Sequence, residues 1–196
     1  MVCALARATV IEQVAVVEAP ERPARRRERA WVREAQAGSQ QAMEALFRAH
    51  WPSAHRAAYL VVHDPVAAED IAQEAFLSAI RALDRFDRRR PFGPWLHRIV
   101  VNRAIDWARS RALRREVAEA VDSEAPEGRD GWSDETLAAL AALDPDQRAV
   151  VVLRHLLEYT PGEIARMLEL PRGTVNSRLR RALDRLADAL AEEGAP

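Results

Sequence analysis

An arginine-rich segment near the C-terminus carries side chains that can read the edges of DNA bases. Arginine can pair with guanine through two hydrogen bonds, and asparagine can pair with adenine in the same way. The polar face of the helix predicted after Pro171 presents Arg172, Thr174, Asn176, Ser177, Arg178, Arg180 and Arg181. A recognition helix enters the major groove with its first turns, where several of these residues lie. The segment predicts a DNA-reading helix, with a helical hairpin that has a solvated arginine face as the simpler alternative.

The elements around this segment have the layout of a helix-turn-helix. Thr160-Pro161-Gly162-Glu163 is a capping-box sequence and predicts the start of a short helix. Leu170-Pro171-Arg172-Gly173 breaks that helix, and apolar residues from Val175 onward recur on one face of a longer helix. A short helix, a tight turn and a longer amphipathic helix favour DNA binding over the hairpin alternative.

A second group of residues has the composition of a site for unstacked DNA bases. Melted DNA needs aromatic or apolar walls, amide groups that read base edges, and cations for the backbone. The loop before the helix predicted from about residue 95, together with that helix, supplies Phe86, Arg88, Arg89, Arg90, Phe92, Asn102 and Arg103. Trp95, Leu96, Ile99 and Val100 have helical spacing, and we interpret them as core residues.

The outer face of the helix predicted from Pro65 to about Leu83 is the third candidate site. Helical periodicity turns Ile71, Ala72, Ala75, Ala79 and Leu83 inward and leaves Asp70, Gln73, Glu74, Leu77 and Arg81 outside. A mainly acidic patch around one exposed leucine suits a basic partner helix. By itself the patch is better explained as a solvated helix face, by roughly two to one.

The composition predicts an all-α protein with two small helical domains. Of the 196 residues 48% are hydrophobic and only 7 are glycine, which is typical of helices. We expect an N-terminal disordered extension, a helical bundle domain, a flexible acidic linker and a helix-turn-helix domain, at residues 1–30, 31–115, 116–132 and 133–194 respectively. Within the bundle we expect a helix capped by Ser39, an interruption at Pro52, a helix opened by Asp64-Pro65, and a loop over 87–94.

Several classes of protein are excluded by the sequence. Cys3 is the only cysteine, so an internal disulfide and a cysteine zinc site are ruled out, as in a reducing cytosol. The histidines lack metal-ligand spacing, and we expect no metal, no cofactor and no catalytic residue. No stretch approaches the roughly 18 apolar residues of a membrane helix, and the N-terminus does not have the pattern of a signal peptide. We therefore expect a cytoplasmic protein without membrane insertion.

In their order and spacing these segments resemble the sigma-70 family of bacterial sigma factors, specifically the extracytoplasmic-function (ECF) group, over about residues 35–190. Ala68–Phe76 is similar to region 2.2 of the family. Phe92-Gly93-Pro94-Trp95-Leu96, Arg98-Ile99 and Asn102 resemble regions 2.3 and 2.4. Leu143-Asp144-Pro145, Glu163-Ile164-Ala165 and Gly173-Thr174-Val175-Asn176-Ser177-Arg178 resemble region 4.

The resemblance implies a role for each candidate site. Asp70, Gln73, Glu74 and Leu77 would dock on the clamp helices of the β′ subunit of core RNA polymerase. The −10 promoter element would be bound by Phe86, Arg88, Arg89, Arg90, Phe92 and Asn102, with Arg103 and Arg109 on the duplex upstream. The −35 element would be read by Arg172, Thr174, Asn176, Ser177, Arg178, Arg180 and Arg181. The arginine-rich loop 87–91 departs from the family pattern and leaves the preferred −10 base open.

The resemblance also implies partners and a location. A sigma factor of this group binds the β and β′ subunits of core polymerase, recognises promoter DNA and promotes its melting without catalysis of its own. We expect this chain to be a monomer when free and to be associated with the nucleoid. Many members of the group are held inactive by an anti-sigma factor, and the resemblance makes such a protein a candidate partner. Two alternatives stay open: a polymerase-independent helix-turn-helix regulator, and a helical adaptor or anti-sigma-like protein.

Overall fold

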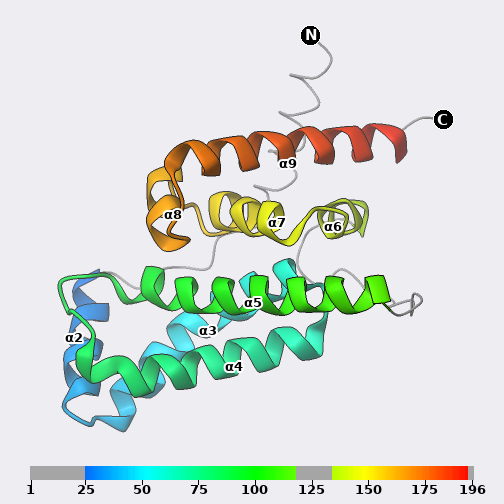
Figure 1. The fold of residues 1–196 in the computed structure, drawn as a ribbon. Coiled ribbons are helices and arrows are strands. Elements are labelled where there is room, and N and C mark those ends of the chain that lie inside the picture. Colours follow the sequence, from blue (N-terminus) through cyan, green and yellow to red (C-terminus); the bar gives the residue numbers. More distant parts are fainter. Residues whose placement is uncertain (1–24, 118–133, 194–196) are drawn as a thin grey trace.

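The computed structural model describes residues 25–117 and 134–193, which are built from helices and contain no strand (Figure 1). The first group comprises α2 (Arg25–Gln36), α3 (Gln40–Val62), α4 (Pro65–Ala82), a 3-10 turn η1 (Leu83–Arg85) and α5 (Phe92–Val117). The second comprises α6 (Asp134–Ala141), α7 (Pro145–Val151), a π-helical turn η2 (Val152–Leu156), α8 (Pro161–Met167) and α9 (Arg172–Glu193). The all-α prediction is confirmed.

In the first group α3, α4 and α5 pack along one another, and α2 lies across one end of them (Figure 1). The three long helices meet largely through alanine, because small side chains let helix backbones approach closely. The fully buried alanines of this core are Ala54, Ala57, Ala58, Ala68, Ala72, Ala75, Ala79 and Ala104. Close packing of these helices gives the later sites a rigid support.

Local capping explains most of the helix boundaries. The Ser39 hydroxyl accepts a hydrogen bond from Ala42 N, and the Asp64 carboxylate accepts one from Ala67 N at 3.0 Å, with Pro65 at the first helical position. The predicted interruption at Pro52 is wrong, because α3 continues through it. Pro52 is exposed, so the one hydrogen bond it removes lies on the solvent side, and burial of the opposite face stabilises the helix.

Two other boundaries differ from the sequence prediction. Helix α2 begins at Arg25, inside the segment predicted to be an extension, because Glu28, Val32 and Ala35 bury one of its faces. Helix α5 begins at Phe92 rather than near Trp95. Residues 1–24 and 118–133, which hold most of the predicted extension and linker, lie outside the described residues, as do 194–196.

The second group packs on the first through one continuous apolar core in which α3 and α5 meet α6, α7, η2 and α8. Arg148 on α7 is buried at this junction and donates to Val61 O (2.5 Å), Ala141 O (2.6 Å) and Leu143 O (2.8 Å). Carbonyls at the C-terminal ends of helices lack helical partners and carry partial negative charge, so a guanidinium suits them. Arg148 thereby joins the end of α3 to the end of α6.

A second polar link crosses the junction. His97 of α5 lies between Ser53 and Tyr159, with Nε2 2.9 Å from Ser53 Oγ and Nδ1 2.7 Å from Tyr159 Oη. Ser53 Oγ already donates to His50 O, so it accepts from Nε2–H, and Nδ1 accepts from the tyrosine hydroxyl. The predicted domains therefore form one closed body joined by buried polar groups as well as apolar ones.

Candidate nucleic-acid and polymerase interfaces

Helices α8 and α9 form the predicted helix-turn-helix. Thr160 N donates to Glu163 Oε2 at 2.8 Å and Glu163 N donates to Thr160 Oγ1 at 3.3 Å, which is the predicted capping box. Val175, Leu179, Ala182 and Leu186 bury the apolar face of α9. On its polar face Arg172, Asn176, Arg180 and Arg181 are exposed, whereas Thr174, Ser177 and Arg178 are half-buried.

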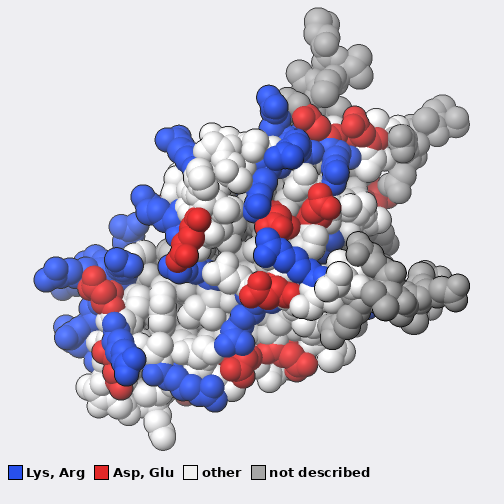
Figure 2. All heavy atoms as spheres, viewed as in Figure 1, with Lys and Arg blue, Asp and Glu red and all other residues white. Residues whose placement is uncertain are grey.

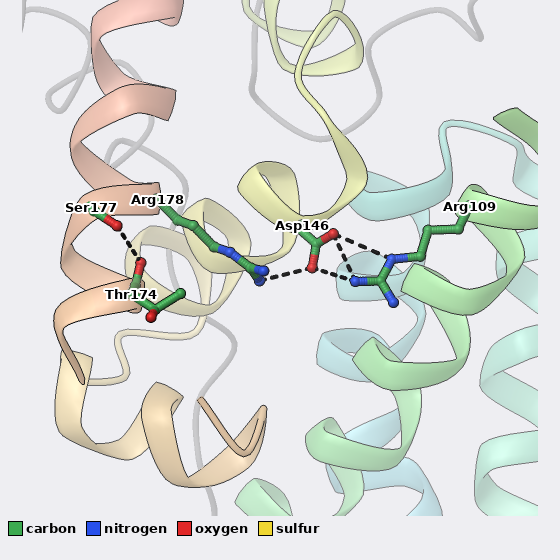
Figure 3. Close-up of polar contacts among 5 residues, drawn as sticks. All are labelled: Arg109, Asp146, Thr174, Ser177 and Arg178. Atoms are coloured by element: carbon green, nitrogen blue, oxygen red, sulfur yellow. Dashed lines mark hydrogen bonds and ion pairs between the residues drawn. The ribbon is translucent and has the colours of Figure 1, made fainter. Parts of the chain in front are cut away.

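The half-buried residues of α9 are held by contacts within the protein (Figure 3). Ser177 Oγ donates to Thr174 O at 3.0 Å, and Arg178 Nη1 lies 2.8 Å from Asp146 Oδ1 in the first turn of α7. Arg181 Nε also donates back to Ser177 O at 3.3 Å. Part of the predicted −35 surface is therefore engaged internally in this arrangement.

Asp146 binds a second arginine from the opposite side, Arg109 of α5 (Figure 3). Arg109 Nη2 lies 2.7 Å from Oδ1 and 2.8 Å from Oδ2, and its Nε lies 3.3 Å from Oδ2. Arg109 is one of the two residues, with Arg103, predicted to contact duplex DNA upstream of the −10 element. One carboxylate thus connects arginines that the sequence assigns to two different promoter contacts.

A cavity of about 240 Å³ lies beside this carboxylate, between α5 and the helix-turn-helix. Asn102, Arg109, Asp146 and Arg178 line it together with Ile105, Asp106, Leu168 and Leu170. A further ion pair, between Arg98 of α5 and Glu169 after α8, joins the same two parts. The structure brings Asn102 and Arg109 to the side of α5 that faces the second helical group.

The aromatic residues of the predicted −10 site are not accessible. Phe86 and Phe92 are 8% and 3% exposed, and both pack on Trp95, with ring centroids 4.6 Å and 5.6 Å apart. The apolar core takes up both rings in this arrangement, and their predicted contact with a base stays a prediction.

The arginines between these rings are exposed. Asp87 turns the loop by accepting from Arg89 N at its carboxylate and from Arg90 N at its carbonyl, both at 2.9 Å. Arg88, Arg89 and Arg90 point into solvent. Figure 2 shows basic side chains gathered at the end of the molecule where α2 and the α4–α5 connection lie.

The outer face of α4 has the predicted orientation. The five residues predicted to point inward are buried, whereas Asp70, Gln73 and Leu77 are exposed and Glu74 is half-buried. Arg103 lies against this helix, donating to Ser78 Oγ at 2.7 Å with its Nη2 3.6 Å from Glu74 Oε1. Arg103 therefore borders the α4 face instead of the interdomain cavity.

Sequence reasoning missed two apolar residues beside this face. Phe47 of α3 and Ile80 of α4 are 39% and 43% exposed, and Leu77 of α4 is 48% exposed. Phe47 and Ile80 both line a shallow apolar depression between α3 and α4 with Phe76. The signal was available for Ile80, which follows Leu77 by three residues on the same helix. For Phe47, periodicity alone indicated a core position.

Burial lowers the pKa of two histidines outside these surfaces. The pKa of His63 falls to about 3, chiefly through burial and then through the charge of Arg148, and that of His155 falls to about 4 through burial and Arg154. Over residues 25–117 and 134–193, no three histidine, cysteine or acidic side chains cluster as metal ligands. In the same ranges, no helix has the length and apolarity needed to cross a bilayer.

A helical bundle carrying a helix-turn-helix and exposed arginines defines a class of helical DNA-binding proteins, and comparison with known proteins is more specific. Models of sigma-70 region 2 and sigma-70 region 4 match residues 46–114 and 133–186. The ECF RNA polymerase sigma factor SigM of Mycobacterium tuberculosis is 38% identical over 157 residues, covering 79% of this chain and 80% of that protein. ECF sigma factor SigW of Bacillus subtilis is 30% identical over 178 residues, covering 82% and 95%.

Two solved structures of sigma factors have a fold similar to that of this chain. CnrH in complex with the cytosolic domain of CnrY matches with a TM-score of 0.66 and 30% identity, covering 86% of this chain and 99% of that one. RpoE of Bartonella quintana, solved with the anti-sigma factor NepR, matches in fold with a TM-score of 0.65 and 24% identity, covering 76% and 96%. The chain belongs to the sigma-70 family and is an RNA polymerase sigma factor of the ECF group. The alternative of a polymerase-independent regulator is not favoured.

Proposed function

We propose that this sigma factor binds core polymerase through α4, reads promoter DNA through α5, the loop 87–91 and α9, and must separate its two helical groups to do so. The observation that carries the proposal is the Asp146 carboxylate, which holds Arg109 and Arg178 together. In this closed arrangement two arginines proposed to contact different promoter elements lie on one side chain.

Promoter geometry makes opening necessary under these assignments. The −35 and −10 elements are centred about 25 base pairs apart, which is roughly 85 Å along straight B-DNA at about 3.4 Å per base pair, and the duplex that Arg109 is proposed to contact lies somewhat nearer to the −35 element. Arg109 and Arg178 both lie within 2.8 Å of one carboxylate oxygen. Strong bending of so short a duplex is costly, so the two helical groups have to move apart.

The proposed polymerase contact is the exposed face of α4, namely Asp70, Gln73, Glu74 and Leu77, enlarged by Phe47 and Ile80. Its acidic rim and apolar centre suit a partner that offers basic side chains around an apolar surface. Clamp helices of the β′ subunit are the partner that the family resemblance implies. Charge complementarity steers the encounter, and apolar burial supplies most of the affinity.

The proposed −10 contacts are Arg88, Arg89, Arg90, Asn102, Arg103 and Arg109, without Phe86 and Phe92, which are buried. Unstacking a base costs a few kcal/mol, so a site that holds only the flipped base favours melted DNA by a comparable amount. The proposed −35 contacts are Arg172, Thr174, Asn176, Ser177, Arg178, Arg180 and Arg181. Their arginines and asparagine have the donors for base edges and phosphates.

The partners of the solved relatives suggest one more partner for this chain. CnrH was solved with the cytosolic domain of CnrY, and RpoE with the anti-sigma factor NepR. We propose that an anti-sigma protein binds this chain, that the chain acts in the cytoplasm on the nucleoid, and that polymerisation chemistry stays in the polymerase.

Run-off transcription tests the proposal. Purified protein is combined with sigma-free core polymerase and fragments of the host genome, and start sites are aligned to give the promoter elements. Transcripts that require both proteins support the proposed function. Specific binding to duplex promoter DNA without core polymerase, and no transcript with it, would instead support a free helix-turn-helix regulator.

A further inference from the structure

Helix α2 lies outside both stretches that match the sigma-70 models, yet it contacts both ends of the connection between α4 and α5. At the first end, the side-chain amide of Gln36 donates to Leu83 O at 2.8 Å and to Phe86 O at 3.0 Å. Leu83 begins the 3-10 turn η1 and Phe86 follows it, just before the loop 87–91. Gln36 therefore fixes the point at which the loop leaves α4.

At the other end, Glu28 caps the start of α5. Its Oε2 accepts from Phe92 N at 3.3 Å and its Oε1 accepts from Gly93 N at 3.2 Å. The first amides of a helix have no partner within the helix, and a carboxylate is favoured there. The Glu28 side chain is only 8% exposed, and its Oε1 also lies 3.0 Å from Nε2 of the buried His50.

The fit around Glu28 is tight. A Cβ at position 93 would lie 3.2 Å from the ring of His50, so glycine allows the start of α5 to approach α3 this closely. Burial by itself would raise the pKa of Glu28, but His50 and the amides of Gly93 and Phe92 stabilise the carboxylate, and its pKa is lowered overall. Glu28 is therefore a charged, fixed anchor.

Between these anchors the loop is exposed, with one long contact of 3.5 Å from Arg29 Nη2 to Arg89 O. Both anchors come from one helix, eight positions apart, and Val32 and Ala35 between them are buried. Because two turns of one rigid helix hold both ends, the end-to-end span of the loop is set.

We propose that Glu28 and Gln36 are positioning residues that fix the Arg88–Arg90 loop in the conformation that selects the flipped −10 base. This inference rests on the proposed −10 role of that loop. Phosphate contacts through long arginine side chains tolerate a loose loop, since they are electrostatic and carry no sequence information. Discrimination between bases requires a fixed donor and acceptor geometry, so loosening the loop reduces selectivity before it reduces affinity.

The test measures the dissociation constants of the full-chain holoenzyme for four single-stranded −10 oligonucleotides that differ only at the flipped position. The variants are Glu28→Gln and Gln36→Ala, with Glu34→Gln as the matched control because Glu34 is exposed on the same helix. Loss of one or two fixed hydrogen bonds should reduce the ratio of best to worst affinity by about tenfold and the mean affinity by less than about threefold. The control should keep both values.

The outcomes separate this inference from the proposed function. A uniform loss of affinity with an unchanged ratio in both variants would overturn the positioning role. A triple variant in which Arg88, Arg89 and Arg90 become alanine tests the loop itself. If the triple variant keeps its selectivity, the −10 role of the loop fails; if it alone loses selectivity, only the positioning role fails. Should Glu28→Gln not fold, Gln36→Ala decides, because it changes no buried charge.

Discussion

Replacing Asp146 with asparagine is expected to shift the protein from the closed arrangement toward an open one. The substitution keeps the shape of the side chain and removes the charge that holds Arg109 across the junction and Arg178 beside it. The two guanidinium groups that remain repel each other, and relief of that repulsion favours separation of the two helical groups.

The structure sets the size of the effect. The side chains of Arg109 and Asp146 are 55% and 26% exposed, so solvent screens their attraction and the pair is worth the roughly 0.5–1 kcal/mol of a surface ion pair, despite its bidentate geometry. Repulsion between the unpaired arginines adds a similar amount. A total of about 1–2 kcal/mol raises the ratio of open to closed molecules by roughly 5- to 30-fold.

Fluorescence energy transfer between two dyes reads this ratio. Cys3 is replaced by serine, and cysteines for the dyes are placed at Gln40 on α3 and Ala191 on α9, which are exposed and belong to different helical groups. Asp188→Asn is the matched control, because it removes an equal charge from an exposed site on α9. The Asp146 variant should show lower transfer than both the parent and this control.

The response to salt provides an independent check. Raising the ionic strength to about 1 M shortens the Debye length to about 3 Å and weakens the parent pair, so the parent should open. The same screening weakens the repulsion between the two arginines of the variant, so the variant should not open further. Transfer efficiencies equal to those of the parent at both ionic strengths would refute the assignment of Asp146 as a link between the two helical groups. So would an Arg109→Gln variant that stays fully closed.

Three further predictions concern docking, promoter reading and stability. The double variant Asp70→Ala, Glu74→Ala should bind core polymerase about 5- to 10-fold more weakly at low salt, because it loses two charges at the rim of the proposed interface. An unchanged affinity in a pull-down titration would remove the docking assignment. Arg180→Ala with Arg181→Ala should weaken binding of holoenzyme to −35 duplexes and lower the salt slope by about 2, whereas loss of core binding in this variant would contradict the division of labour. Because the folded-state pKa of His63 is lowered to about 3 from 6.5, the unfolded chain takes up the proton first, and the parent loses stability as the pH falls from about 6.5 toward 3. Asparagine tolerates the left-handed φ of 51° at position 63, so the His63→Asn variant should fold. Between pH 7 and pH 5 this variant should lose less free energy of unfolding, measured in urea, than the parent does. An equal loss in the two proteins would show that His63 does not set the acid sensitivity.

Features that depend on neighbours within about four residues were predictable from the sequence. The Ser39 and Asp64 caps and the Thr160–Glu163 capping box are confirmed, as are the buried face of α4 and the apolar stripe of α9. Each of these features follows from helix periodicity or from the unpaired amides of a helix's first turn. Both of these causes depend only on residues that are close together in the sequence. The order of these local features was also sufficient to indicate the sigma-70 family.

Features that join distant parts of the chain were decided only by the tertiary structure. Glu28 caps a helix that begins 64 residues later, and Asp146 binds an arginine 37 positions before it. The burial of Phe86 and Phe92 depends in the same way on where α2 and α3 pack. No local rule specifies these contacts, because they require the geometric fit of several helices at once. Sequence alone supplied the helices and their polar faces, and packing decided which polar groups are exposed and which hold the closed molecule together.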